Sequence, residues 1–405
     1  MLGAPAGLVA EPSLATTVIE ESDPRRFMTA LAAATAQGGT VILASENWGE
    51  HERRQLAALR DRAQVTPATA AGKGWLCIPT GGTGGVLKFA RHDEDTIAAA
   101  VVGFHRHFKS AGFNAAGVLP LHHVSGLMAW LRSTLTGCEY WPLDWKKIEA
   151  GELPPLPARR EGWVISLVPT QLERLLRSAT AVEWLQGFRI IFLGGAPAWP
   201  ELLAAAAAAQ LPLSLGYGLT ETAAMVTALR PEEFLLGARD SGSALEHAAV
   251  QVGRNGVISV WGDSLFRGYH PEWRDRRPFA TGDLGRLDAN GHLHVLGRRD
   301  AVIITGGEKV VPAEIEAVLR GTGQFPDVVV LGLPDARWGQ LVVAVYPGSA
   351  QPDFHSVIRV MSRLAVYKRP KSYIPLVGPW PANAQGKVDR AALLAQVVRQ
   401  RKERR

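Results

Sequence analysis

The feature that most constrains the fold is a regular alternation of short apolar runs with helical patterns, which begins at Cys77. Apolar runs typical of strands cover residues 115–121, 163–169, 188–194 and 211–216. Segments with a helical spacing of apolar residues interleave with them, at 93–111, 126–135, 170–178 and 200–210. Because strands that alternate with helices usually pair in parallel, this pattern predicts an α/β fold with mostly parallel sheets.

The pattern changes after residue 250, where short strands are predicted close together. They cover residues 256–261, 285–288 and 292–296, and two Asn-Gly pairs, at 255–256 and 290–291, are strong signals of β-hairpins. An antiparallel, barrel-like β segment therefore closes a large unit. A small α+β unit is predicted to follow, with a helix at 312–321 that starts with proline. The expected division is a large N-terminal domain, 1–299, and a small C-terminal domain, 300–405.

Size and composition fit a globular protein with more than one core. The chain has 405 residues, of which 47% are hydrophobic and 20% are charged. No apolar run is long enough to span a bilayer, and residues 1–10 lack the basic start of a signal peptide. The two cysteines, Cys77 and Cys138, are too few for a disulfide framework or a metal motif. These features predict a reducing, cytoplasmic setting.

The charge of the chain is concentrated at its C-terminus. The formal net charge is +6, but residues 399–405 carry five positive charges and one negative charge, so the rest carries only +2. A protein that binds nucleic acid usually has a basic face or stripe, so no nucleic-acid partner is expected. The tail is interpreted as the solvated end of a helix, with weak attraction to an anionic membrane or a partner as the alternative.

A glycine-rich loop follows the apolar run at 75–79. From Thr80 to Lys88 it reads Thr-Gly-Gly-Thr-Gly-Gly-Val-Leu-Lys. Glycine lets backbone N–H groups curl around an anion, threonine adds hydroxyl donors, and the lysine adds a cation. A polyphosphate needs these groups, although a flexible surface turn has a similar composition.

Two further segments carry the residue types of a nucleotide site. After the fourth predicted strand, Tyr217 offers a flat ring, Thr220 a hydroxyl, and Glu221 a carboxylate suited to Mg²⁺. The alternative for Thr220 and Glu221 is a helix cap. Further along, Asp283 could accept hydrogen bonds from both ribose hydroxyls, and Arg298 could donate to the sugar or a phosphate. The alternative for this pair is a turn aspartate with a surface salt bridge.

Two loops complete the set. One runs from Thr305 through a Gly-Gly-Glu-Lys segment into the helix at 312–321, and the other places Lys387 beside a glycine before the final helix. Each is weak evidence alone, because an isolated Gly-Lys pair usually lies on the surface.

The segments around Asp283 and Arg298 count as two, which makes six in all. Taken in order and at these long spacings, the six segments resemble the adenylate-forming superfamily of acyl- and aryl-CoA ligases, which also includes luciferases and peptide-synthetase adenylation domains. The resemblance covers residues 74–394. It implies that ATP and Mg²⁺ activate a carboxylic acid as an acyl-adenylate, that CoA then accepts the acyl group, and that the C-terminal domain is a mobile lid.

The resemblance also implies roles for individual residues. The ATP phosphates would be held by Thr80, Gly81, Gly82, Thr83, Gly84, Gly85 and Lys88. Adenine and ribose would be held by Gly195, Ala196, Tyr217, Asp283 and Arg298. Thr220 would contact the α-phosphate, Glu221 would bind Mg²⁺, and Lys387 would bridge the carboxylate and the α-phosphate. The hinge would be Asp300, and CoA would approach Gly306, Gly307, Glu308 and Lys309.

Two segments resemble the walls of the superfamily's acyl pocket. His123, in a His-Val-Ser-Gly segment, stands at a position usually held by histidine or an aromatic residue and is expected to be catalytic, with a buried packing histidine as the alternative. The other expected pocket residues are Ser125, Gly126, Ser166, Thr170 and Gly216.

The form of these two segments is most similar to superfamily members that activate o-succinylbenzoate in menaquinone and phylloquinone synthesis. That substrate carries two carboxylates and a ketone, and the pocket hydroxyls together with Arg132 could donate hydrogen bonds to it. Other aryl or short-chain acids, such as benzoate or cinnamate, would keep the same fold.

The chain departs from the superfamily pattern in two places. Gly81, Gly84 and Leu87 stand where Ser, Thr and Pro are usual, so backbone N–H groups are expected to carry more of the phosphate binding. The N-terminal region is also short for the superfamily, as if part of an early subdomain were trimmed.

Other functions are weighed against this one. A domain that loads a carrier protein is less expected, since no carrier domain follows. A P-loop kinase is disfavoured because Phe89, not Ser or Thr, follows Lys88. A non-catalytic nucleotide-binding module would be expected to lack Glu221 or Lys387, and both are present. The oligomeric state stays open between a monomer and a homodimer.

Overall fold

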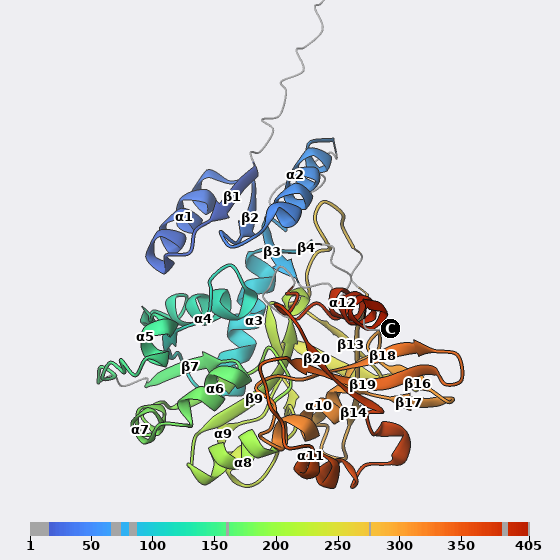
Figure 1. The fold of residues 1–405 in the computed structure, drawn as a ribbon. Helices are drawn as coiled ribbons and strands as arrows, with labels where there is room; N and C mark the ends of the chain where they lie inside the picture. Colours follow the sequence, from blue (N-terminus) through green and yellow to red (C-terminus); the bar gives the residue numbers. More distant parts are fainter. Residues whose placement is uncertain are drawn as a thin grey trace, which may run out of the picture.

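The computed structural model describes residues 16–65, 74–80, 87–158, 162–274, 277–382 and 388–403. It has the predicted α/β fold, built from four sheets with helices around them (Figure 1). The blue elements at the top of the figure form a small lobe, the green elements surround the largest sheet, and the orange and red elements form the end of the chain.

The largest sheet has seven strands in the order β11-β10-β9-β8-β7-β5-β6. Five of them are parallel: β5 (Asn114–Gly117), β6 (Tyr140–Pro142), β7 (Trp163–Leu167), β8 (Ile190–Leu193) and β9 (Leu213–Leu219). Two antiparallel strands extend the sheet beyond β9: β10 (Ala224–Ala228) and β11 (Ser243–Ala244). The four strands predicted from the sequence are confirmed as β5, β7, β8 and β9.

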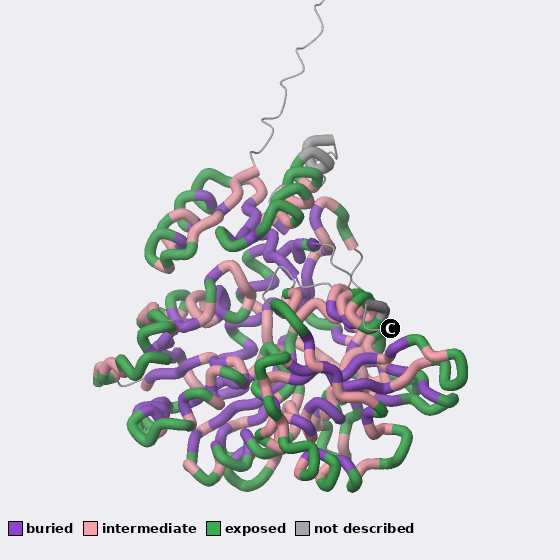
Figure 2. The backbone as a smooth tube through the Cα atoms, viewed as in Figure 1, coloured by how far each residue is buried: buried purple, intermediate pink, exposed green. Residues whose placement is uncertain are grey.

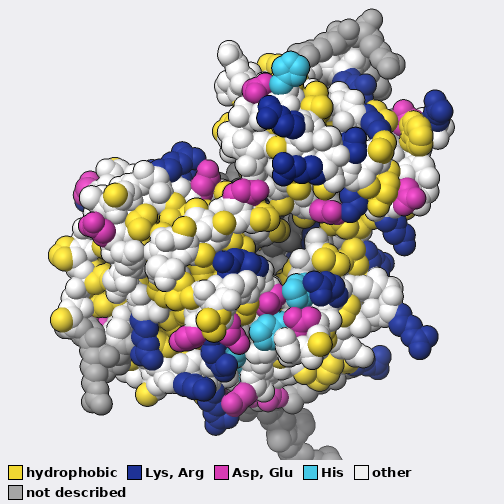
Figure 3. Space-filling model, turned by 90° about the horizontal axis from the view of Figure 1, so that it is seen from below, with side chains coloured by type: hydrophobic (Ala, Val, Ile, Leu, Met, Phe, Trp, Pro, Cys, Tyr) yellow, Lys and Arg dark blue, Asp and Glu magenta, His cyan; other side chains and the backbone are white. Residues whose placement is uncertain are grey.

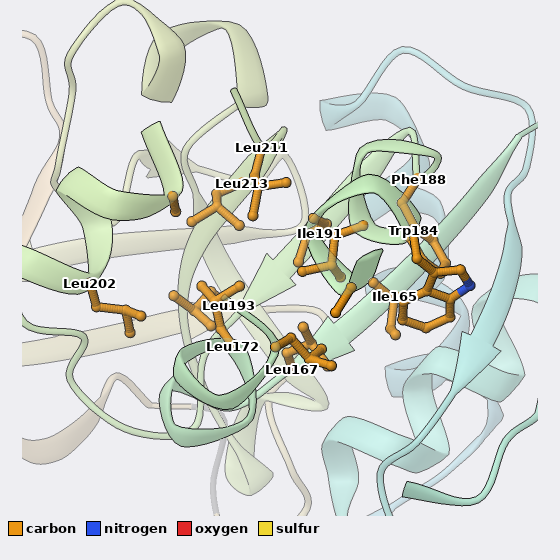
Figure 4. Packing of buried hydrophobic residues seen from close by; sticks show 14 of the residues in the cluster. Ile165, Leu167, Leu172, Trp184, Phe188, Ile191, Leu193, Leu202, Leu211 and Leu213 are labelled. Carbon is orange, nitrogen blue, oxygen red and sulfur yellow. The ribbon is translucent and has the colours of Figure 1, made fainter. Parts of the chain in front are cut away.

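Helices cover both faces of this sheet. They are α3 (Glu94–His107), α4 (Val124–Thr134), α5 (Trp145–Glu149), α6 (Pro169–Leu175), α7 (Ala179–Gln186), α8 (Pro200–Ala208) and α9 (Pro231–Leu235). Successive strand residues point to opposite faces, so Ile191 packs with Leu172 and Trp184 (Figure 4), whereas Ile190 packs with Phe104 of α3. Burial on both faces explains why these strands appear in the sequence as continuous apolar runs.

The small lobe holds a four-stranded sheet in the order β1-β2-β3-β4. Its elements are β1 (Thr16–Glu20), α1 (Pro24–Gln37), β2 (Thr40–Ala44), α2 (Glu50–Val65), β3 (Leu76–Thr80) and β4 (Lys88–His92). The first three strands are parallel and β4 is antiparallel to β3. The sequence does not predict β4, because Lys88, Arg91 and His92 interrupt its apolar pattern.

The third sheet is antiparallel and follows the predicted hairpins. Its strands are β12 (Ala248–Val252), β13 (Val257–Gly262), β14 (Phe279–Leu287) and β15 (Leu293–Arg298). Gly256 and Gly291, the glycines of the two Asn-Gly pairs, both have φ of +77°, which confirms tight turns at these positions. Strand β14 starts before the sequence predicts it, so Asp283 lies within a strand and the interpretation as a turn aspartate is wrong.

The last part of the chain forms a mixed sheet in the order β17-β16-β19-β18, with β20 beside β19. Its elements are β16 (Ile303–Thr305), β17 (Glu308–Val310), α10 (Pro312–Gly321), β18 (Val329–Asp335), β19 (Gly339–Pro347), α11 (Phe354–Met361), β20 (Ser372–Leu376) and α12 (Arg390–Glu403). Helix α10 has the predicted bounds and packs against α8 and β15. The division of the chain at residue 299 stays a prediction.

Burial follows this layering, since the strands are mostly buried and the outer helices expose one side (Figure 2). Within the described ranges, none of the helices is both long enough and apolar enough to cross a membrane. On the face shown in Figure 3, basic and acidic side chains are interspersed rather than gathered into a continuous basic surface.

Candidate functional site

Many of the predicted site residues lie along one edge of the seven-stranded sheet. Because β5, β7, β8 and β9 are parallel, their carboxyl ends share this edge, where ligands bind in open α/β sheets. The segments that follow these strands carry His123, Ser125, Gly126, Thr170, Gly195, Ala196, Thr220 and Glu221. The edge is open, since Ser125, Thr170, Gly195 and Ala196 are exposed. Ser166 and Gly216 lie within β7 and β9 and are half-buried.

Glu221 is the centre of a polar cluster at this edge. It lies in η1 (Thr220–Thr222), a single 3-10 turn after β9, and is only 8% exposed. The Thr80 hydroxyl donates to Glu221 Oε1 at 3.2 Å, and the Tyr269 hydroxyl donates to the same oxygen at 2.6 Å. Within the described residues no donor bonds Oε2, and a carboxylate oxygen is the type of ligand that a cation such as Mg²⁺ prefers.

The predicted phosphate loop connects β3 and β4. Thr80 and Lys88 face each other in the register of this hairpin, and the Lys88 Nζ atom lies 5.0 Å from the centre of the Tyr269 ring. The structure therefore brings Thr80, Lys88 and Glu221 together. The other predicted phosphate ligands, Gly81, Gly82, Thr83, Gly84 and Gly85, lie outside the described residues, as does Lys387.

Two residues of this cluster were not predicted from the sequence, Tyr269 and His92. The His92 Nε2 atom lies 2.7 Å from the carbonyl oxygen of Thr220, and since that oxygen can only accept, Nε2 carries the proton. Burial lowers the pKa of His92 to about 4, against the opposing effect of the Thr220 carbonyl, so the ring is neutral at neutral pH. His92 lies beside no glycine, and Tyr269 follows Gly268 in a Gly-Tyr pair that lies outside the six segments, so the signal in the sequence is absent for His92 and weak for Tyr269.

A second polar network joins β9 to the third sheet. The Tyr217 hydroxyl donates to Asp283 Oδ2 at 2.7 Å, and Arg298 Nη1 donates to Asp283 Oδ1 at 3.3 Å. Arg298 also donates to both carboxylate oxygens of Asp300, each at 3.1 Å. The predicted ribose residues are thus in contact with each other and with the predicted hinge.

Tyr217 is held on two sides. Its ring packs in a buried cluster with Val226 and Ile258, while its hydroxyl reaches Asp283. Burial, followed by the charge of Asp283, raises the pKa of Tyr217, so the hydroxyl stays a donor. The predicted stacking of this ring on a base stays a prediction.

Tight packing fixes the start of α4, which carries part of the predicted acyl pocket. A Cβ atom on Gly126 would lie 2.3 Å from the Pro120 carbonyl oxygen, so only glycine fits there. His123 is the N-cap residue of α4, and its ring centre lies 4.3 Å from that of His122. Burial lowers the pKa of His122 to about 4. The acyl and catalytic roles predicted for this segment stay predictions.

Arg132, two turns further along α4, is a buried cation. Its guanidinium lies 4.0 Å from the centre of the Phe104 ring, and its Nε and Nη2 atoms have no hydrogen-bond partner in the described part of the chain. Burial lowers the pKa of Arg132 to about 9. Burial also lowers the pKa of His247 to about 4, helped by the charge of Arg132. A buried guanidinium with unused donors is suited to an anion.

The residues predicted to meet CoA form a separate turn. Gly306 and Gly307 connect β16 to β17, Glu308 and Lys309 begin β17, and all four residues are exposed. Gly306 and Gly307 have φ of +57° and +83°, and the Trp338 ring packs against Gly306. In the described part of the chain, no hydrogen bond or ion pair joins this turn to the Glu221 cluster, so its role stays a prediction.

The family of the chain follows from its match to a family model. The model described as AMP-binding enzyme matches residues 9–270, which is more than half of the chain. The chain belongs to the AMP-binding enzyme family. The Glu221 cluster and the strands that position it lie within the matched residues.

Relatives of this AMP-binding enzyme include two curated 2-succinylbenzoate–CoA ligases. The one from Listeria monocytogenes serotype 4b is 34% identical over 290 residues, which cover 68% of this chain and 60% of that protein. The one from Bacillus licheniformis is 31% identical over 333 residues, which cover 78% of this chain and 67% of that protein. The matched region spans about 60% of the length of the first curated relatives.

Solved structures of AMP-binding enzymes share the fold. The o-succinylbenzoate CoA synthetase from Bacillus subtilis, in complex with the acyl-adenylate intermediate, aligns with a TM-score of 0.79 at 24% identity, covering 93% of this chain and 87% of that chain. A fatty acyl CoA synthetase from Mycobacterium tuberculosis aligns with a TM-score of 0.63 at 23% identity, covering 96% of this chain and 89% of that chain. At this level of identity the likeness concerns the fold.

Proposed function

We propose that this AMP-binding enzyme is an acid–thiol ligase that activates 2-succinylbenzoate (o-succinylbenzoate) with ATP, releasing pyrophosphate, and then transfers the acyl group to CoA with release of AMP. Family membership and the names of relatives above 30% identity support this activity. The observation that carries it is the Glu221 cluster, which places a carboxylate, one of whose oxygens receives no hydrogen bond from a described residue, with a threonine hydroxyl and a lysine at the open edge of a parallel sheet.

The chemistry explains why such a cluster is needed. A carboxylate is a poor electrophile, and it must approach a triphosphate that is also negative. Glu221 would hold Mg²⁺ and Lys88 a phosphate oxygen, and the ion, when bound, screens negative charge on the phosphates. Asp283 and Arg298 would fix the ribose, and Thr220 would contact the α-phosphate. Holding reactants in position can supply about 7–11 kcal/mol of such a barrier.

The end of the chain would supply two different functions to this edge. In the proposed division, residues 300–405 move about Asp300, so that Lys387 serves the adenylation and the turn at 306–309 serves the transfer to CoA. The bidentate contact between Arg298 and Asp300 lies at the junction and supports a hinge there.

Arg132 supports the choice of an acid with two carboxylates. One carboxylate is activated at the carboxyl edge, so a dicarboxylic acid needs a second anion site further inside. Arg132 lies on α4, the helix that starts at the predicted acyl pocket, and has buried donors that no described residue uses. A monocarboxylic substrate would leave these donors unpaired, at a cost of about 1–3 kcal/mol.

A panel of acids tests the substrate. Pyrophosphate release and CoA thioester formation would be measured with 2-succinylbenzoate, benzoate, cinnamate and a short-chain fatty acid. We expect 2-succinylbenzoate to have the highest kcat/KM. Faster turnover of a monocarboxylic acid would contradict the substrate, and absence of pyrophosphate release with every acid would favour a non-catalytic nucleotide-binding module.

The same panel applied to Arg132→Met tests the second anion site. Methionine fills the space without a charge, so the fold should be retained, while the KM for 2-succinylbenzoate should rise about 10- to 100-fold and that for benzoate should change little. Arg106→Met, which removes an exposed arginine of α3, is the matched control and should leave both values unchanged.

A further inference from the structure

Tyr269 lies in a segment that contacts both β4, which carries Lys88, and η1, the turn that carries Glu221. This segment, 266–270, runs beside β4, with a hydrogen bond from the His270 N–H to the Phe89 carbonyl at 2.9 Å and a β-bridge between Tyr269 and Ala90. At its other end the Phe266 N–H donates to the main-chain carbonyl of Glu221 at 2.8 Å. The backbone of Tyr269 is therefore fixed relative to both β4 and the turn that carries Glu221.

The Tyr269 side chain contacts both charged groups of the cluster. Its hydroxyl donates to Glu221 Oε1 at 2.6 Å, and its ring faces the Lys88 ammonium at 5.0 Å from the ring centre. The Phe266 ring packs edge-on against it, with ring centres 4.9 Å apart, and restricts its rotation. One side chain thus holds an anion through its hydroxyl and a cation through its face.

This arrangement keeps the two charges available. Thr80, which pairs with Lys88 across the hairpin, also donates to Glu221, so the lysine and the carboxylate share both Thr80 and Tyr269 as neighbours. An ion pair between them would occupy the lysine that a phosphate needs and the carboxylate that a cation needs. With Tyr269 in place, the lysine rests on a neutral ring and the carboxylate keeps Oε2 unbonded among the described residues.

We propose that Tyr269 is a positioning residue that holds the Glu221 carboxylate and the Lys88 ammonium apart and oriented, so that a divalent cation and a phosphate bind to them together. The inference rests on the proposed function, because it takes Glu221 as the cation ligand and Lys88 as the phosphate ligand. It adds a residue that lies outside the six segments on which the resemblance rests.

The two contacts of Tyr269 can be tested separately by binding. ATP affinity would be measured by calorimetry over a range of Mg²⁺ concentrations, with no acid present and no turnover required. Tyr269→Phe removes only the hydroxyl, so the Mg²⁺ concentration for half-maximal ATP binding should rise about tenfold, while ATP affinity without Mg²⁺ stays unchanged. Tyr269→Leu also removes the ring and should weaken ATP binding without Mg²⁺ as well.

Controls separate positioning from general stability. Tyr367→Phe, at a 36% exposed tyrosine, should match the wild type in both measurements. In a Glu221→Gln background, Tyr269→Phe should add no further change in Mg²⁺ dependence, since the oriented charge is already lost. The double variant tests the same contact from the Glu221 side.

The outcomes distinguish the two levels of the proposal. A wild-type protein that does not bind ATP would overturn the proposed function. ATP binding with an Mg²⁺ dependence that Tyr269→Phe leaves unchanged would overturn only the role of Tyr269. An equal loss of ATP affinity in both tyrosine variants at every Mg²⁺ concentration would also overturn it, because that pattern indicates a structural residue.

Discussion

Single residues of the site are fixed by hydrogen bonds between segments far apart in the chain. Thr80 and Glu221 are 141 residues apart, and Tyr217 and Asp283 are 66 apart. Thr80 of β3 donates to Glu221, which follows β9, and Tyr217 of β9 donates to Asp283 of β14, so each carboxylate accepts from a strand of a different sheet. The charged groups are therefore oriented by the assembled fold rather than by their own loops, which is how a site gains precise positions.

Lys387 lies outside the described residues, so its predicted role in adenylation is tested by mutation. We expect Lys387→Ala to abolish pyrophosphate release, because the lysine would stabilise charge developing between the acid and the α-phosphate. A preformed acyl-adenylate should still react with CoA, since that step does not need this group. Both half-reactions would be assayed, with the exposed Lys147→Ala as the control. Unchanged pyrophosphate release in Lys387→Ala would refute the assignment.

At the scale of elements, β9, η1 and β10 form one closely packed hairpin. Gly218 of β9 pairs with Met225 of β10, and a Cβ atom on Gly218 would lie 1.9 Å from the Ala224 carbonyl oxygen. The turn between these strands carries Glu221 and has Ala223 at φ of +49°. The position of the carboxylate therefore depends on the close approach of two backbones at a glycine.

Gly218→Ala tests this dependence. The added methyl group must push β9 and β10 apart, so we expect the free energy of unfolding to fall by about 1–3 kcal/mol and Mg²⁺-dependent ATP binding to weaken. Urea denaturation and calorimetry would measure the two effects. Gly49→Ala, where the nearest atom is the mobile Glu52 carboxylate, should change neither.

At the scale of the whole molecule, neutral histidines that are buried or, in the case of His122, half-buried are spread over several parts of the fold. Burial lowers the pKa of His92, His122, His247 and His270 to about 4 in each case. An unfolded chain protonates histidine below about pH 6.5, whereas these folded residues resist protonation until about pH 4. The unfolded state therefore binds more protons in this window, so stability is lost as the pH falls.

We expect the free energy of unfolding to decrease steeply between about pH 6.5 and pH 4, by up to about 1.4 kcal/mol per pH unit for each buried histidine. Urea denaturation at several pH values would measure the slope. His247→Gln removes one titrating group, so the difference in bound protons between the unfolded and folded states, which sets the slope, should fall by about one. His51→Gln, at an exposed histidine, should leave the slope unchanged. Equal slopes in all three proteins would contradict this account.

The sequence predicts the large sheet well because its signal is strong and local. The four central strands are apolar runs buried on both faces, and α10 has the predicted bounds after its starting proline. Strand β4 is missed because its polar residues have partners elsewhere, such as Arg91, which bonds the Gly74 and Pro271 carbonyls. A local pattern cannot report a partner 180 residues away.

The same limit applies to the site. Glu221, Asp283 and Arg298 stand out in the sequence because each follows a glycine motif or lies beside one. Tyr269 follows a single glycine, Gly268, and His92 follows none, and the importance of both appears only when β4, η1 and the segment at 266–270 come together.

The sequence by itself determined the α/β class, the order of the nucleotide-binding segments and the chemical types that they contribute, because periodicity and glycine spacing are local properties. Only the tertiary structure decided which groups face each other. Contacts between distant segments produce the two donors on Glu221 Oε1 and the bonds of Arg298 to both Asp283 and Asp300. They also bury Arg132 Nε and Nη2 without a described hydrogen-bond partner. Packing brings together residues from distant parts of the chain, and the electrostatics of a site depend on those distances.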